Sequence, residues 1–129
     1  MGNDHPIRGC SILVVDDDDT IRHILRRMLE GAGYEVREAP NGKVAIEELR
    51  RRPAHVMITD IFMPEQEGIE TIRIARKDYP DLGIIAISGA AGENYLKMAE
   101  LLGASASLLK PFRLKDVLET VRATLLGRV

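Results

Sequence analysis

Carboxylates follow two short apolar segments of the chain. Asp16 and Asp17 come directly after segment 11–15, and Asp60 comes directly after segment 56–59. Short, continuously apolar runs are typical of strands that are buried on both faces, as in a parallel sheet. The residue that ends such a strand lies at the edge where open α/β folds bind their ligands. A carboxylate there is either partly solvated without a role or placed to react, and the rest of the chain decides between the two.

The residue types at these segment ends suit phosphoryl transfer with a metal ion. If Asp16, Asp17 and Asp60 lie together, their charges repel, and a hard divalent cation such as Mg²⁺ relieves the repulsion through oxygen ligands. Phosphoryl transfer also needs an in-line nucleophile and positive groups around the phosphoryl oxygens. Asp60 can act as the nucleophile, Lys110 supplies a flexible positive charge, and Ser88 supplies a hydroxyl donor.

An alternating series of strands and helices must position these residues. Strands are predicted at 11–15, 35–39, 56–60, 83–87 and 106–109, and helices at about 43–51, 69–78 and 93–102. Two further helices are indicated by apolar stripes at helical spacing, which are Ile21, Ile24, Leu25, Met28 and Leu29, and then Leu114, Val117, Leu118, Val121 and Leu125. Asp18 or Asp19 is the predicted N-cap of the first helix, and Asn41-Gly42 opens the second.

The polarity of the strands predicts their order in the sheet. The first, third and fourth strands are apolar throughout and belong in the centre, whereas the second and fifth are mixed and belong at the edges. Right-handed crossovers then favour an α/β, flavodoxin-like (βα)5 doubly wound parallel sheet with strand order 2-1-3-4-5. In that order Asp16, Asp17 and Asp60 meet where the winding reverses, and Ser88 and Lys110 end the next two strands on the same edge.

Composition excludes several classes of protein. The 129 residues suit one domain, with residues 1–10 as a short lead-in and residues 11–129 as the folded part. The net charge of −2 gives no general attraction to nucleic acid or to a membrane surface. A single cysteine, Cys10, excludes an internal disulfide, and the chain has no Cys/His set at metal-ligand spacing. No signal peptide or long apolar span occurs in the sequence, so a cytoplasmic protein is expected.

The sequence resembles the receiver domain of two-component response regulators from Ser11 to Leu126. The motifs that carry the resemblance are Asp16-Asp17 after an apolar strand, Asp60 followed by Met63-Pro64 and Gly68, Ile87-Ser88-Gly89, Gly103-Ala104, and Lys110-Pro111-Phe112. Five ordered motifs at matching spacing are far more specific than one pair of aspartates.

The resemblance implies a role for each of these positions. Asp60 would accept the phosphoryl group, Asp17 would bind Mg²⁺ directly, and Asp16 would bind it largely through water. The backbone carbonyl of Phe62 would complete the protein ligands of the metal. Ser88 and Lys110 would grip the phosphoryl group, and the Lys110-Pro111 peptide bond would be cis.

The resemblance also implies partners. A histidine kinase or histidine phosphotransfer protein would donate the phosphate, and the protein would switch partner binding or relay the phosphate onward. It would be a single-domain response regulator, a monomer or weak homodimer, and would not be an enzyme beyond its own phosphorylation and dephosphorylation.

The sequence departs from the family pattern at Ser107 and at Gln66-Glu67, where the family usually has Met-Asp before the glycine. Ser107 stands three residues before Lys110, where the family often has an aromatic residue that moves inward on phosphorylation. Coupling between Asp60 and the surface formed by the last two helices and the last strand is therefore expected to be weak or to follow another route. Phe62 places bulk beside Asp60, which is expected to slow attack by water on the phosphorylated form.

Other interpretations remain open at this point. Asp16-Asp17-Asp18-Asp19-Thr20 also fits a haloacid-dehalogenase-type phosphohydrolase, with Asp16 as the nucleophile, Asp18 as the acid/base and Lys110 as the stabilising cation. Against it, only a helix follows Lys110, where such enzymes need an acidic pair. A receiver-like adaptor that acts without phosphorylation is the third interpretation. The helix face with Arg22, His23, Arg26 and Arg27 is expected to be solvated, or otherwise to dock a kinase.

Overall fold

Strands and helices alternate five times along the residues that the computed structural model describes, 9–61, 67–89 and 93–127. Their bounds are β1 (Ser11–Val15), α1 (Asp19–Gly31), β2 (Glu35–Ala39), α2 (Gly42–Arg51), β3 (Val56–Asp60), α3 (Glu67–Asp78), β4 (Gly83–Ser88), α4 (Glu93–Leu101), β5 (Ala106–Leu109) and α5 (Leu114–Leu126). The predicted strands are confirmed, with β4 one residue longer than expected. α3 begins at Glu67, two residues before its predicted start.

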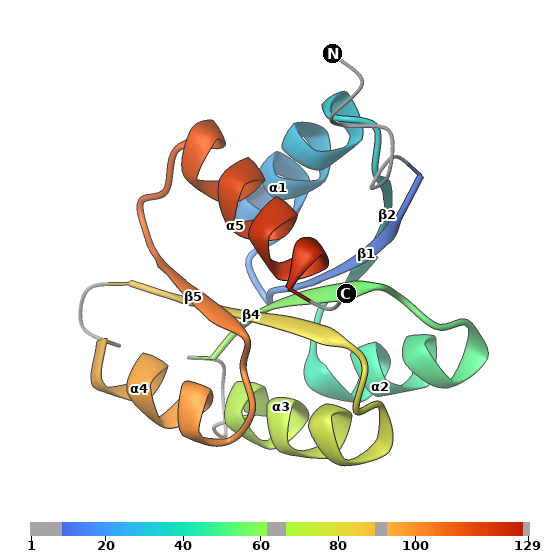
Figure 1. Cartoon of the computed structure of the whole chain (residues 1–129), viewed down its shortest axis with the longest axis vertical. Helices are drawn as coiled ribbons and strands as arrows, with labels where there is room; N and C mark the ends of the chain where they lie inside the picture. Colours follow the sequence, from blue (N-terminus) through green and yellow to red (C-terminus); the bar gives the residue numbers. More distant parts are fainter. Residues whose placement is uncertain (1–8, 62–66, 90–92, 128–129) are drawn as a thin grey trace.

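The five strands form one parallel sheet in the order β2-β1-β3-β4-β5. This confirms the flavodoxin-like order predicted from strand polarity. Figure 1 shows α1 and α5 on one face of the sheet and α2, α3 and α4 on the other. Because β1 and β3 are direct neighbours, with Val15 opposite Thr59, the residues that follow these two strands emerge side by side.

Alternate residues of the central strands enter two separate cores. Leu13, Val15 and Met57 pack with the helices α2, α3 and α4, while Val14 and Ile58 pack with α1 and α5. All residues of β3 and β4 are buried, whereas β5 has no fully buried residue. Burial on both faces explains why the central strands are continuously apolar, and exposure of the edge explains the mixed sequence of β5.

Two apolar residues lie outside the stripes predicted for them. Ile24 in α1 is 41% exposed, and Leu114 in α5 is 48% exposed. At 3.6 residues per turn, Ile24 lies about 100° around the helix from Leu25, which is fully buried. Leu114 is the first residue of α5 and precedes Val117, the first fully buried residue of that helix, by almost one turn.

Capping agrees with the predicted helix starts. Asp18 is the N-cap of α1, and its carboxylate accepts hydrogen bonds from the backbone N–H groups of Thr20 and Ile21. Asn41 caps α2 in the same way through the N–H of Val44. No helix in the described part of the chain combines the length and apolar character that a membrane span requires.

Candidate functional site

Asp16 is the first residue after β1 and is completely buried. Its backbone N–H donates to the carbonyl oxygen of Ala39 at 3.2 Å, which continues the pairing of β1 with β2. Its carboxylate oxygen Oδ1 accepts a hydrogen bond of 2.9 Å from the backbone N–H of Asp18. The neighbouring Asp17 is exposed, so the two adjacent acids differ in their access to water.

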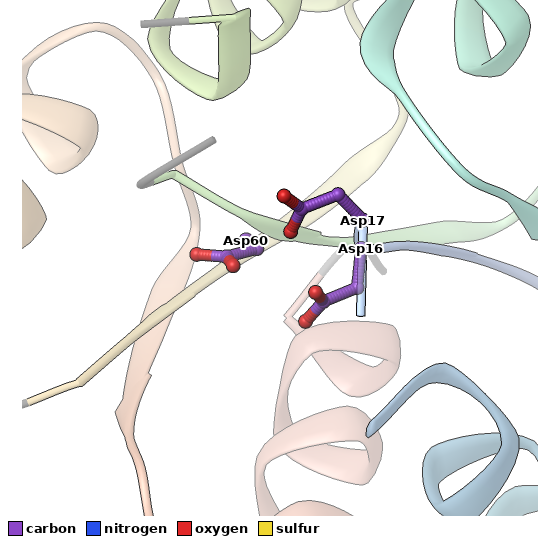
Figure 2. Close-up of side chains that lie close together, drawn as sticks. All are labelled: Asp16, Asp17 and Asp60. Atoms are coloured by element: carbon purple, nitrogen blue, oxygen red, sulfur yellow. The ribbon is translucent and has the colours of Figure 1, made fainter. Parts of the chain in front are cut away.

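Asp60 is the last residue of β3 and lies beside the acids that follow β1. Carboxylate oxygens of Asp16, Asp17 and Asp60 lie within 4.8 Å of one another. Figure 2 shows the three side chains gathered at the carboxyl ends of the strands. Asp60 itself is only 5% exposed. The predicted convergence of the three carboxylates is confirmed.

Lys110 reaches this cluster from the end of β5. Its Nζ atom lies 3.3 Å from Oδ2 of Asp16 and 3.3 Å from Oδ2 of Asp60. The backbone N–H of Lys110 donates to the carbonyl oxygen of Ser88 at 2.7 Å, which ties the ends of β4 and β5 together. The Lys110-Pro111 peptide bond is cis, as the resemblance implied.

Ser88 ends β4 on the same edge of the sheet. Its side chain is 1% exposed, and its Oγ atom has no hydrogen-bond partner among the described residues. A buried hydroxyl without a partner is unfavourable for folding. Among the described residues, the hydroxyl of Ser88 is therefore left available to a bound group.

Burial and like charges act together on Asp16. Burial raises the pKa of its carboxyl from 3.8 to about 6, and the charge of Asp60 adds to the increase, against the hydrogen bond from Asp18 and the charge of Lys110. Burial by itself would lower the pKa of Lys110, but the charges of Asp60 and Asp16 outweigh it and raise the pKa above its ordinary value. The ammonium group of Lys110 therefore pairs with two of the three clustered carboxylates, and these four groups together keep an excess of negative charge.

The donors in the cluster fit a hard divalent cation. All three are carboxylate oxygens, which Mg²⁺ prefers, and ligands on opposite sides of a Mg²⁺ ion lie about 4 Å apart. The three carboxylate oxygens lie within 4.8 Å of one another, somewhat wider than that value. Asp16, Asp17 and Asp60 are thus the described residues suited to hold Mg²⁺. Phe62, whose carbonyl was the fourth predicted ligand, lies outside the described residues.

The matching protein family is the response regulator receiver domain, whose family model covers residues 12–122. The chain belongs to this family. The positions of Asp60 and Lys110 are those that the sequence resemblance led us to expect, and the strand order is the one predicted from strand polarity.

A response regulator receiver protein and part of a sensor kinase are similar in sequence to this receiver domain. It is 37% identical over 116 residues to the response regulator receiver protein CpdR of Brucella abortus, and the match covers 90% of this chain and 97% of CpdR. It is 33% identical over 119 residues to the sensor kinase CckA of the same species, but spans only 13% of that protein.

A solved receiver domain structure is similar to this protein over most of both chains. The CheY-like receiver domain protein of Methanospirillum hungatei matches with a TM-score of 0.87 and 29% identity, over 93% of this chain and 96% of that one.

The receiver domain contains one site feature that the sequence did not indicate. Arg22, predicted to lie on a solvated helix face, has a side chain only 11% exposed. Its guanidinium binds the Asp16 carbonyl oxygen, Asp19 and Glu38. The prediction for Arg22 was wrong because Glu38 of β2 lies beside α1 and binds this residue, whereas His23 and Arg27 on the same helix face are exposed, as predicted. The pattern of polar and apolar residues in α1 predicts which residues face away from the sheet. It does not predict that Glu38 of the next strand binds Arg22.

Asp18 and Ser107 each have a defined hydrogen-bonding role in the receiver domain. The carboxylate of Asp18 caps α1 and is not one of the three carboxylates that gather at the edge of the sheet. Ser107 in β5 donates its hydroxyl to Glu100 of α4 at 3.1 Å. The first arrangement removes the acid/base residue that the phosphohydrolase interpretation needs.

Proposed function

We propose that this receiver domain accepts a phosphoryl group on Asp60 in a Mg²⁺-dependent reaction. The observation that carries the proposal is the position of the Asp60 carboxylate, which shares a cluster with Asp16 and Asp17 and lies 3.3 Å from the Lys110 ammonium. Asp60 is held on the last residue of a buried strand, so its carboxylate needs little reorganisation before attack.

Transfer of the phosphoryl group to Asp60 exchanges one bond to phosphorus for another. A carboxylate oxygen of Asp60 forms a bond to the phosphorus of a donor phosphohistidine, and the phosphorus–nitrogen bond breaks. The electron pair of that bond returns to the imidazole of the donor, which takes up a proton. The product on this chain is an aspartyl phosphate at Asp60.

The remaining residues of the site stabilise the charge on the phosphoryl oxygens. Asp16, Asp17 and Asp60 would hold Mg²⁺, and the ion would supply positive charge at these oxygens. Lys110 moves from its pair with Asp60 to a phosphoryl oxygen, and Ser88 donates its hydroxyl to another. The lack of a described partner for the Ser88 hydroxyl supports this role.

For the donor, we propose a histidine kinase or a histidine phosphotransfer protein. The similarity to part of the sensor kinase CckA and to nearly all of CpdR supports a place in two-component signalling. We further propose a single-domain response regulator that catalyses only its own phosphorylation and dephosphorylation. A cytoplasmic location, a monomer or weak homodimer, and the absence of nucleic-acid and membrane partners stay predictions.

For the output, we propose contact with a protein through the groove between α4 and α5. This groove has a volume of about 540 Å³, and Leu96, Ser107 and Phe112 are among the residues that line it. With serine at position 107, no ring from β5 fills the groove. We therefore expect its shape to depend on the Ser107–Glu100 hydrogen bond and on the movement of Ser88, rather than on the turning of an aromatic side chain.

The proposal is tested by incubation with Mg²⁺ and a small acyl phosphate, followed by intact-mass analysis. The wild type is expected to gain one phosphoryl group, and EDTA or the substitution Asp60→Asn is expected to prevent the gain. Asp18→Asn is the matched control, because asparagine also caps helices and residue 18 lies outside the cluster. It should label like the wild type.

The other outcomes decide between the alternatives. Label that persists in Asp60→Asn and disappears only in Asp16→Asn would support a phosphohydrolase with Asp16 as the nucleophile. A wild type that stays unlabelled with every donor, including a purified histidine kinase, would support an adaptor that acts without phosphorylation.

A further inference from the structure

We propose that Arg22 is a positioning residue for the metal site, because its guanidinium fixes the peptide unit that joins Asp16 to Asp17. This inference rests on the proposed function, in which these two aspartates hold Mg²⁺. It assigns to α1 a direct part in the geometry of the site, in addition to its packing on the sheet.

The hydrogen bonds of Arg22 connect three parts of the chain. Its Nη1 atom donates to the carbonyl oxygen of Asp16 at 2.8 Å, its Nη2 atom donates to Asp19 at 2.6 Å, and its Nε atom donates to Glu38 of β2 at 2.8 Å. The guanidinium is planar, so bonds from three of its nitrogens fix both its position and its orientation. The arginine is therefore held by β2 and by the first turn of α1 while it binds the end of β1.

The bond to the Asp16 carbonyl oxygen acts on both acids. The carbonyl of Asp16 and the N–H of Asp17 belong to one planar peptide unit, and rotation of that unit moves the Asp17 side chain. The backbone N–H of Asp16 is held by Ala39, and its carboxylate is held by Asp18 and Lys110. Arg22 fixes the one remaining polar group of Asp16, its carbonyl oxygen.

Burial makes this restraint strong. The side chain of Arg22 is 11% exposed, that of Glu38 is 15% exposed, and Asp16 is completely buried. Hydrogen bonds that are shielded from water are electrostatically stronger, and a carbonyl oxygen left without its donor there is costly. Without the guanidinium, the peptide unit is expected to turn its oxygen toward water and carry Asp17 away from Asp60.

Arg26 offers a matched control for Arg22. It stands one turn later on α1 and donates to the same Glu38 at 2.9 Å, and its other described acceptor is Glu30. Both arginines thus bind Glu38, whereas the bond to Asp16 comes from Arg22. A comparison of the two separates the loss of charge beside Glu38 from the loss of the bond to the metal-site loop.

The test measures Mg²⁺ affinity by isothermal titration, independently of phosphorylation. Arg22→Met is expected to bind Mg²⁺ about tenfold more weakly than the wild type, the size of effect found when groups that orient metal ligands are removed. Arg22→Lys keeps the charge but cannot form the three directed bonds, so it is expected to restore only part of the affinity. Arg26→Met is expected to stay within about twofold of the wild type.

A stability control excludes a general effect of loosening the fold. Leu125→Ala truncates a residue that is 7% exposed near the end of α5, whereas Lys110 precedes the start of that helix. It should lower the melting temperature and leave Mg²⁺ affinity unchanged. In the metal-free protein, the backbone amide resonances of Asp17 and Asp18 should shift in both Arg22 variants and stay in place in Arg26→Met.

The outcomes are distinguishable. Equal Mg²⁺ affinity in Arg22→Met and Arg26→Met would overturn the inference and leave the proposed function intact. If Arg22→Met does not fold, the same comparison is made with Arg22→Lys, and equality there also overturns it. A wild type that binds no Mg²⁺ would instead overturn the proposed function, and the role of Arg22 with it.

Discussion

Replacing Asp16 by asparagine removes a completely buried carboxyl whose pKa is raised to about 6. The ordinary value is 3.8, so the folded protein holds this proton more tightly than the unfolded chain does. The stability that comes from the protonated carboxyl of Asp16 is fully present below pH 3.8 and is lost as the pH rises from 3.8 through about 6. Above that range, the ionised Asp16 destabilises the metal-free fold.

The magnitude follows from the difference between the two pKa values. Each unit corresponds to about 1.4 kcal/mol, so a difference of roughly two units gives about 3 kcal/mol above pH 7. Asp16→Asn removes this cost and should therefore be more stable than the wild type by about 2 to 3 kcal/mol in EDTA at neutral pH. The lower end of the range allows for an amide that faces Lys110 less favourably than a protonated carboxyl would. At about pH 5 the gain should fall to roughly half.

Urea denaturation followed by circular dichroism measures this difference in the free energy of unfolding, and Mg²⁺ should narrow it. The wild type should gain about 1.4 kcal/mol at a Mg²⁺ concentration ten times its dissociation constant, whereas Asp16→Asn should gain much less. A variant that is less stable than the wild type in EDTA at neutral pH would refute the electrostatic reasoning. A gain that stays constant between pH 5 and pH 7.5 would refute it as well.

Three further predictions concern the rest of the site. Ser88→Ala should slow the labelling of Asp60 by acyl phosphate but change the free energy of unfolding by less than about 0.5 kcal/mol, since the hydroxyl has no described partner. A large loss of stability with normal labelling would contradict this. Gly68→Ala should destabilise the folded protein by about 2 kcal/mol or more, because a Cβ atom at this position would overlap the backbone of Asp60. Gly31→Ala, which has no described atom near its Cβ, should not destabilise it, and equal melting temperatures of the two variants would contradict this packing. Mg²⁺ affinity should fall as the pH drops below 6 and Asp16 takes up a proton, and a titration showing constant affinity between pH 5 and pH 7.5 would contradict the role of Asp16 as a ligand.

The sheet and the acidic cluster could be predicted because they depend on patterns that run along single segments. β1, β3 and β4 are continuously apolar and must be covered on both faces, which fixes them at the centre. Once β1 and β3 are neighbours, Asp16 and Asp60 must meet, since both follow the carboxyl ends of their strands. Capping by Asp18 and Asn41 follows from local chemistry in the same way.

The surroundings of Arg22 could not be predicted because they depend on contacts between segments. An arginine in a polar stripe gives the same pattern whether it faces water or a carboxylate on the next strand. Glu38 accepts bonds from Arg26 and Arg22, and although its burial would raise the pKa of the carboxyl, these bonds lower it below its ordinary value. The network of Arg22, Arg26 and Glu38 exists only because β2 is placed beside α1.

Exposure of apolar residues at the helix margins was missed for a similar reason. Ile24 and Leu114 match a helical stripe by spacing, but spacing does not show how wide the buried face of a helix is or at which turn its burial begins. The hydroxyl of Ser88 was predicted at the site by its place at a strand end. The lack of a described partner within the chain could be established only from the packed structure.

The identity of the residue that carries the phosphate is the most direct question to put to this protein. The wild type is phosphorylated with Mg²⁺ and an acyl phosphate, and the product is reduced with borohydride, which converts an aspartyl phosphate to homoserine, before peptides are sequenced by mass spectrometry. We predict homoserine at position 60, in the peptide that contains the end of β3. Homoserine at position 16, or a fully labelled protein with aspartate intact at position 60, would contradict the assignment of Asp60 as the phosphoryl acceptor.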